Sequence, residues 1–265
     1  MNILIIGDGE VEKALVDLCL RSKKLDHIYI ASNNKNESIP NIEYSSLEDL
    51  ISKAKSVQAD AILFIDKTLI EKDFIDLCRK NMLNVFSVNK KWLNLETSRL
   101  VAKQLMTHYS ISTPRVLKIP TVFPVVLRTI SSREVYIAKS MQDLVSKKEE
   151  LFGQEVFIEE YLEGEIYEMT SLWDGKNLLS FPIANISEVQ KERLDLYNTK
   201  LNFMLSDEKA DFMGFFISRL LWAKNDWYVL EYKMGFDSTT NFENIKTDFV
   251  SILDSAIYQK LNEIA

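Results

Sequence analysis

The first 88 residues alternate between short apolar segments and segments with the apolar spacing of a helix. An apolar strand opens the chain, and a helix with its apolar residues on one face follows a glycine turn at positions 7–9. Further buried strands are predicted at Asp60–Ile65 and Val85–Val88, with a helix over Leu69–Asn81 between them. Strands that alternate with helices form a parallel sheet covered by helices. The predicted fold class of this part is therefore α/β, with a doubly wound parallel sheet.

From Thr121 onward the pattern changes to short strands joined by turns. Before this change, Ser87–Pro114 resembles the connector helix and the extended entry segment of a known family, which is named below, and Pro114 fits the end of such an extended segment. The elements predicted after it are strands at Val122–Arg128, Glu134–Ala138 and Val156–Tyr161, a helix over Met141–Leu151, strands at Phe212–Ala223 and Trp227–Lys233 around an Asn225-Asp226 turn, and a helix over Asp248–Ile264.

One pair of adjacent strands carries the most specific motif. Glu155–Gly175 reads EVFIEEYLEGEIYEMTSLWDG, which predicts a strand, a tight turn and a second strand. Taken alone, this motif also fits an acidic hairpin at the edge of any sheet. Together with Val229–Asp237, which reads VLEYKMGFD, it resembles the adenine hinge and the metal strand of ATP-grasp ligases. The order of elements over nearly the whole chain resembles one family, phosphoribosylamine–glycine ligase (glycinamide ribonucleotide synthetase).

This resemblance implies an organisation and a reaction. Residues 1–93 would form a Rossmann-like domain and 94–120 a connector helix and linker, with residues 121–163 as the small lobe and 164–265 as the large lobe of an ATP-grasp domain. In the family, which acts in purine biosynthesis, ATP phosphorylates a carboxylate and an amine then displaces phosphate from the acyl phosphate. ATP and magnesium are the implied cofactors.

The resemblance also implies roles for individual residues. The implied nucleotide ligands are Arg99 and Arg128 for the phosphates, the backbone of Phe157–Leu162 with Tyr161 and Leu162 for adenine, Glu159, Glu160 or Glu165 for the ribose, and Glu231, with Lys233 beside it, for the metal. The phosphate of the amine substrate is implied at Gly7, Asp8 and Gly9, while a turn that only packs the strand against the helix is the alternative for these residues.

Two parts of the nucleotide site depart from the family pattern. The metal strand of the family ends in Leu-Glu-Phe-Asn, and Lys233 stands at the asparagine position. Because an ammonium group has donors only, it cannot ligate a cation. Lys233 is expected either to lie where magnesium would, paired with Glu231 and with phosphate, or to form a surface salt bridge at the strand end. The glycine-rich phosphate loop is replaced by a segment in which only the hydroxyls of Ser131 and Ser132 offer substitutes.

The substrate side departs as well, and two functions stay open. Asp8, Glu10 and Glu12 place three carboxylates at the glycine turn, which opposes phosphate binding there. The segment Pro182–Phe212 is shorter than in the family, and no further carboxyl-terminal domain is expected. The first function is an ATP-dependent carboxylate–amine ligase, divergent and with weak or lost native activity. The second is a non-catalytic relative, a pseudoenzyme that binds nucleotide or a protein partner. No catalytic residue is assigned.

Charge and cysteine content restrict the partners. A net charge of −7 and a pI near 5.1 argue against nucleic acid. No apolar run reaches the roughly 18 residues that a membrane span needs, and the chain starts with a strand, so a cytoplasmic protein without a membrane partner is expected. Cys19 and Cys78 lack metal-binding spacing and are predicted to be reduced core residues, and His27 and His108 to be structural. The expected partners are a nucleotide and a small-molecule substrate, while a homodimer and a companion subunit both stay open.

Overall fold

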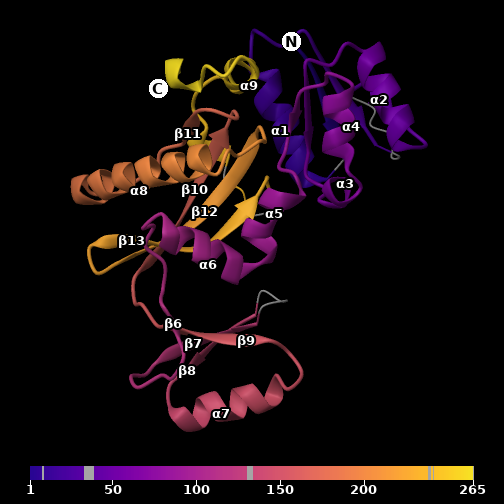
Figure 1. Cartoon of the computed structure of the whole chain (residues 1–265). Helices are drawn as coiled ribbons and strands as arrows, with labels where there is room; N and C mark the ends of the chain where they lie inside the picture. Colours follow the sequence, from indigo (N-terminus) through magenta and orange to yellow (C-terminus); the bar gives the residue numbers. More distant parts are fainter. Residues whose placement is uncertain (8, 33–38, 130–133, 238–239, 241, 265) are drawn as a thin grey trace.

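The structure is a computed structural model that describes residues 1–7, 9–32, 39–129, 134–237, 240 and 242–264 (Figure 1). The predicted contributions of Asp8, Ser131 and Ser132 lie outside these residues. Three sheets follow one another along the molecule. The amino-terminal sheet lies at one end, a four-stranded sheet lies in the middle, and a smaller four-stranded sheet lies at the other end (Figure 1).

The amino-terminal sheet is parallel and has helices on both faces, as predicted. Its strand order is β3-β2-β1-β4-β5, and its strands are β1 (Asn2–Ile6), β2 (His27–Ala31), β3 (Asn41–Ile42), β4 (Ala61–Phe64) and β5 (Val85–Phe86). Because side chains alternate along a strand, Ile3 and Ile5 pack with α1 (Glu10–Leu20) and α9 (Phe249–Ile257). Leu4 and Ile6 pack on the other face with α2 (Leu47–Ser56) and α4 (Phe74–Lys80). The doubly wound parallel sheet is confirmed.

Two predicted helices are each interrupted. The helix predicted over Leu69–Asn81 consists of α3 (Thr68–Glu71) and α4, because Asp73 between them has a left-handed backbone with φ of 58°. The prediction of a single connector helix is also wrong. The segment forms two helices, α5 (Lys90–Thr97) and α6 (Arg99–His108), which are separated by the extended backbone of Ser98. This break makes Arg99 the first residue of a helix.

The small sheet has the order β6-β9-β7-β8 and is antiparallel. Its strands are β6 (Val116–Leu117), which the sequence did not predict, β7 (Val125–Thr129), β8 (Val135–Ala138) and β9 (Val156–Glu160). Helix α7 (Met141–Glu150) covers one face, where Leu127 and Ile158 are buried against Leu144. Arg128 and Glu159 are the next residues along the same two strands, so they face the opposite side.

The middle sheet has the order β11-β10-β12-β13 and is antiparallel. It contains β10 (Glu165–Trp173), β11 (Leu178–Ser180), β12 (Gly214–Ala223) and β13 (Asp226–Met234). One face is covered by α8 (Glu188–Asp207), a helix that the sequence analysis missed. Trp227 donates from Nε1 to the Gln190 carbonyl over 2.8 Å, and Tyr197 donates to Ser218 Oγ over 2.7 Å, so this face is closed by packing and hydrogen bonds.

A β-bulge decides which side chains of β13 face away from α8. The register shifts between Arg219, which pairs with Glu231, and Leu220, which pairs with Val229, so Leu230 is an extra residue on β13. A bulge of this kind changes the face on which the following side chains lie. Val229 before the bulge and Tyr232 after it are both in the core under α8. Glu231 and Lys233 therefore face the open side of the sheet.

Glycine permits two close approaches that join the sheets. A Cβ on Gly164 would lie 2.0 Å from the Trp222 carbonyl oxygen, so the segment after β9 can pass against β12 only with glycine at this position. A Cβ on Gly214 would lie 2.9 Å from the backbone nitrogen of Ser87, where β12 meets the end of the amino-terminal sheet.

The remaining predictions are confirmed in part. The β12–β13 turn consists of Lys224 and Asn225, both with positive φ, one residue earlier than predicted. The final helix, α9, ends at Ile257, and a short 3-10 turn follows it. Cys19 and Cys78 are buried free thiols, as predicted. Among the described residues, no helix combines the length and the apolar character of a membrane span.

Candidate functional site

The first turns of α6 place two cations one turn apart. Arg99 Nη2 lies 2.7 Å from Glu231 Oε2 on β13. Lys103 Nζ lies 2.6 Å from Glu159 Oε1 on β9, and it also donates to the carbonyl of Pro114. Side chains four residues apart lie on the same face of a helix. Helix α6 therefore contacts the middle sheet through Arg99 and the small sheet through Lys103.

Glu159 is the most deeply buried carboxylate of this region. Its side chain is 2% exposed and lies between two cations, with Arg128 Nε 2.6 Å from Oε2 and Lys103 Nζ on the other oxygen. A buried carboxylate is tolerated only when it is paired in this way. Burial lowers the pKa of the Lys103 ammonium, while the charge of Glu159 acts in the opposite direction, and the net pKa lies below the ordinary value.

Glu231 forms the corresponding centre on the middle sheet. Its Oε2 accepts from Arg99, and its Oε1 accepts from Arg219 Nη1 on β12 over 3.0 Å. Burial raises the pKa of this carboxyl, but the charges of Arg99 and Arg219 outweigh burial, and the pKa lies below its ordinary value.

The two centres form one electrostatic unit. Arg128, from the small sheet, lowers the pKa of the Glu231 carboxyl on the middle sheet, and it also lowers the pKa of Arg99, for which burial is the main cause. We refer to the following set as the cationic cluster: Arg99, Lys103, Arg128, Arg219, Glu159 and Glu231. With four cations and two carboxylates, the cluster has an excess of positive charge in an acidic protein.

One donor in the cluster lacks a partner. Arg99 Nη1 is buried and forms no hydrogen bond within the described part of the chain, although the neighbouring Nη2 is bound to Glu231. Buried polar groups without partners are rare in folded proteins, so such a donor indicates a place for an acceptor that binds from outside. The surplus charge around Arg99 favours an anionic acceptor.

Lys233 does not form the ion pair with Glu231 that the sequence predicted, and it pairs with two other carboxylates. Its Nζ lies 3.0 Å from Glu168 Oε1 on β10 and 3.1 Å from Asp237 Oδ2, while Glu231 is bound by Arg99 and Arg219. The alternative of a surface salt bridge is confirmed in part: Lys233 forms salt bridges near the end of β13, but they are buried and not at the surface, because Lys233 is only 8% exposed. Burial lowers the pKa of this ammonium group, but its hydrogen bonds to Glu168 and Asp237 raise the pKa by more, so the net pKa lies above the ordinary value.

The carboxylates of this region do not form a metal cage. Magnesium binds through carboxylate and other oxygen atoms in octahedral geometry. Glu168, Arg219 and Glu231 lie opposite one another on β10, β12 and β13, so a guanidinium separates the two carboxylates. Among the described residues, no group of three or more acidic, histidine or cysteine side chains could hold a metal ion.

The predicted hinge residues lie in β9, in the turn that follows it and at the start of β10. Glu160 is paired with Arg115 at 3.1 Å and with Lys224 at 3.6 Å; burial raises its carboxyl pKa, but the hydrogen bonds from Arg115 outweigh burial and the pKa lies below the ordinary value. Tyr161 is exposed, and Glu165 accepts a hydrogen bond from the Tyr167 hydroxyl.

Leu162 belongs to a small, largely buried apolar cluster beside the hinge, and the partly exposed Tyr228 and Leu230 give this cluster an apolar surface. The Leu162 side chain packs with Leu221 and Ala223 of β12, and Tyr228 and Leu230 of β13 lie against it. Because Leu230 is the bulge residue, this apolar surface and Glu231 lie on the same face of the middle sheet. The arrangement suits a ligand with a flat apolar part and a charged part.

The glycine turn before α1 is filled by the carboxylate of Glu12. A Cβ on Gly7 would lie 2.4 Å from Glu12 Oε1, and a Cβ on Gly9 would lie 2.8 Å from Glu12 Oε2. Glu12 is buried and stands in the first turn of α1, where the partial positive charge of a helix start favours an anion. The chain's own carboxylate thus lies where the predicted substrate phosphate would bind.

Two members of the cationic cluster were missed from the sequence. Lys103 follows Arg99 by four residues, and this spacing could have indicated it once α6 was placed. Arg219 had no comparable signal, because its position opposite Glu231 depends on the bulge at Leu230.

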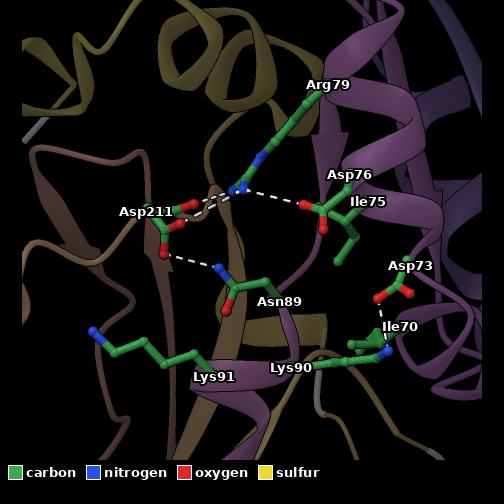
Figure 2. Close-up of a pocket in the computed structure, with 9 residues that line it drawn as sticks. All are labelled: Ile70, Asp73, Ile75, Asp76, Arg79, Asn89, Lys90, Lys91 and Asp211. Carbon is green, nitrogen blue, oxygen red and sulfur yellow. Dashed lines mark hydrogen bonds and ion pairs between the residues drawn. The ribbon is translucent and has the colours of Figure 1, made fainter.

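A cavity lined by none of the residues of the cationic cluster lies between α4, α5 and Asp211 (Figure 2). Its charged residues bind one another: Arg79 lies near both Asp76 and Asp211, and Lys90 Nζ lies 2.6 Å from Asp73. Asn89 also donates to Asp211 Oδ1 over 2.8 Å. Since opposite charges are balanced within the cavity, these contacts hold the amino-terminal part against the middle sheet and supply no excess charge for a ligand.

Comparison with known proteins gives relatives of one fold. No protein-family model matches the chain. The whole chain is 24% identical to the phosphoribosylamine–glycine ligase of Fusobacterium nucleatum and covers 75% of it; the alignment spans 319 positions for a chain of 265 residues, so that relative has segments that this chain lacks.

Solved structures agree with this result. The phosphoribosylamine–glycine ligase of Thermotoga maritima superposes with a TM-score of 0.75 at 18% identity, over 98% of this chain and 76% of that one. The biotin carboxylase domain of the Hydrogenobacter thermophilus 2-oxoglutarate carboxylase, in complex with MgADP, ADP and bicarbonate, gives a TM-score of 0.64 at 15% identity, over 90% of this chain and 64% of that one. The fold is that of ATP-grasp enzymes, as the sequence predicted.

Proposed function

We propose that this chain is an ATP-grasp protein that binds ATP with its phosphates on the cationic cluster, and that its reaction class is ATP-dependent ligation of a carboxylate to an amine. The observation that carries the proposal is the buried Arg99 guanidinium, whose Nη1 lacks a partner within a cluster of surplus positive charge. The similarity to phosphoribosylamine–glycine ligase along the whole chain supports the reaction class.

The residues of the cluster suit the demands of phosphoryl transfer, which is mainly positioning and neutralisation of charge. Arg99 Nη1 would donate to a phosphate oxygen, and Lys103 and Arg128 would neutralise the charge that spreads over the phosphate during transfer. Glu159 holds these two cations in place before the nucleotide binds. The apolar surface at Leu162 would receive the adenine ring, with the backbone of the hinge as its hydrogen-bond partner.

In this reaction a carboxylate oxygen of the substrate attacks the terminal phosphorus of ATP, the bond to ADP breaks, and an acyl phosphate forms. The amine then attacks the acyl carbon and phosphate leaves. The cluster provides charge for the first step, since four cations surround the two carboxylates. No side chain is assigned as the base that takes the proton of the amine.

Two observations favour a second candidate, a relative that binds nucleotide without turnover. Glu12 fills the glycine turn, so a phosphorylated amine would meet a carboxylate of the chain itself. Lys233 and Arg219 lie between the carboxylates that would otherwise face a metal. The first feature concerns the amine substrate, and the second concerns the metal ion that phosphoryl transfer uses.

The test is calorimetric titration with ATP, in buffer with magnesium and in buffer with EDTA. We expect binding in at least one buffer, and we expect Arg128→Gln to raise the Kd at least about tenfold, which corresponds to about 1.4 kcal/mol. Arg193→Gln, at an exposed arginine of α8, is the matched control and should leave the Kd unchanged. No binding in either buffer would reject the nucleotide proposal.

A product assay then separates the two candidates. Release of ADP on addition of glycine and phosphoribosylamine would support the ligase with the relatives' substrates. Binding of ATP without release of ADP, with these or other carboxylate and amine pairs, would support the second candidate.

A further inference from the structure

We infer that this site binds the nucleotide phosphates without a divalent cation, and that the ammonium group of Lys233 is the fixed cation that replaces it. The inference rests on the proposed nucleotide site and specifies the form of nucleotide that the site accepts. It follows from the arrangement of charges on the open face of the middle sheet.

The carboxylates of this face already have cationic partners from the chain. Glu231 has a guanidinium nitrogen on each oxygen, at 2.7 Å from Arg99 and 3.0 Å from Arg219. Glu168 Oε1 is 3.0 Å from Lys233, and Asp237 Oδ2 is 3.1 Å from the same ammonium group. A magnesium ion would have to displace these cations before it could reach the oxygen atoms that it requires.

Lys233 is held in one place by the fold. Glu231 and Lys233 are two residues apart on β13 and therefore lie on the same face, which the bulge at Leu230 turns away from α8; the register places Lys233 opposite Ile217 on β12. The side chain is buried, with a carboxylate from β10 and another from the segment after β13 at its nitrogen. Burial lowers the pKa of Lys233, but the hydrogen bonds to Glu168 and Asp237 outweigh burial, so the net pKa lies above the ordinary value and the group is charged at neutral pH.

The cluster and Lys233 together provide the positive charge that magnesium would bring. Four cations of the cluster face two carboxylates. Lys233 stands two residues beyond Glu231 on the same strand, about 7 Å along it, and faces Glu168 and Asp237, so the whole open face has five cations and four carboxylates. A further divalent ion would be repelled by these fixed charges. A nucleotide that carries no metal has more negative charge, and it therefore complements the site better.

The test compares ATP binding to the unmodified chain in two buffers, one with excess MgCl2 and one with EDTA. We expect the two Kd values to differ by less than about tenfold, or the value in EDTA to be the lower one. A Kd at least tenfold lower with magnesium would overturn the inference and leave the proposed nucleotide site intact. Absence of binding in both buffers would overturn the inference and the proposed nucleotide site together.

Variants test the part played by Lys233. We expect Lys233→Asn to raise the Kd for ATP in EDTA at least about tenfold. Lys233→Arg, which keeps the charge, should stay closer to the unmodified chain. The matched control is Lys209→Asn, at an exposed turn position with φ of 52° that asparagine adopts readily. Equal binding in EDTA by Lys233→Asn and the unmodified chain would overturn the role of Lys233. If Lys233→Asn does not fold, the comparison of the two buffers decides alone.

Discussion

Glu159→Gln should have two opposite effects, one on the free protein and one on its affinity for ATP. Glu159 is 2% exposed and lies 2.6 Å from both Arg128 and Lys103. The amide of glutamine keeps the shape of the side chain but removes the negative charge between these two cations. Removing one member of a buried ion pair costs about 3–5 kcal/mol, because the remaining charge is left buried and uncompensated.

This loss is large enough to measure as a change in melting temperature. For a chain of this size, each kcal/mol changes the Tm by about 2–4 °C, so Glu159→Gln should lower the Tm by roughly 10 °C. Addition of ATP should recover more of the Tm in the variant than in the unmodified chain, because the phosphate replaces the missing charge beside Arg128 and Lys103. At a concentration about 100 times the Kd, a ligand adds about 2.7 kcal/mol.

Glu160→Gln is the matched control. Glu160 is the next residue, and its partners Arg115 and Lys224 are 77% and 61% exposed. Exposed ion pairs contribute about 1 kcal/mol or less, so this variant should lose only a few degrees and gain no additional response to ATP. The reasoning about the buried cluster is refuted if both variants lose the same stability and respond equally to ATP.

Three further predictions concern other parts of the molecule. Gly7→Ala should lower the free energy of unfolding by about 2 kcal/mol in urea titrations, since Gly7 has φ of 115° and a Cβ there would lie 2.4 Å from the Glu12 carboxylate. The control Gly153→Ala, where φ is 85° and a Cβ would have no atom within 4 Å, should lower the free energy of unfolding by about 1 kcal/mol. Equal losses of stability in the two variants would contradict the contact with Glu12. Cys19 and Cys78, whose pKa burial raises to about 12, should react with a thiol reagent at pH 8 only after unfolding; rapid reaction of the folded protein would contradict their burial. Because the folded pKa of Glu231 is lowered, its contribution is present above the unfolded pKa of about 4.3 and is lost as the pH falls through the folded value. Glu231→Gln should therefore flatten the acid side of the stability curve, and an unchanged slope would count against its ion pairs.

Local patterns in the sequence predicted most of the strands and the hinge. The segments of β1, β4 and β9 are short and apolar, and turns or glycines bound them, so each could be recognised without knowledge of the rest of the chain. Helix α8 was missed because apolar residues lie on both its buried and its exposed sides, for example Leu194 and Leu196. The Ser187 capping box at its start was the available signal.

The pairing of charges in the site could not be predicted in the same way. Glu231 and Lys233 were recognised as site residues from the strand that carries them. Their partners, Arg219 and Glu168, lie on other strands, and which of them meet depends on the extra residue Leu230. A change of one residue in register would place both side chains in the core under α8. Such long-range pairings are decided by the packing of whole sheets, which the local sequence does not contain.

A crystal structure of the protein with ADP, grown in EDTA, would show where the phosphates bind. We expect the phosphates to contact Arg99 Nη1, Lys103 and Arg128, with the adenine against the apolar surface at Leu162. A nucleotide bound elsewhere on the molecule, or phosphates turned away from these three cations, would contradict the proposed nucleotide site.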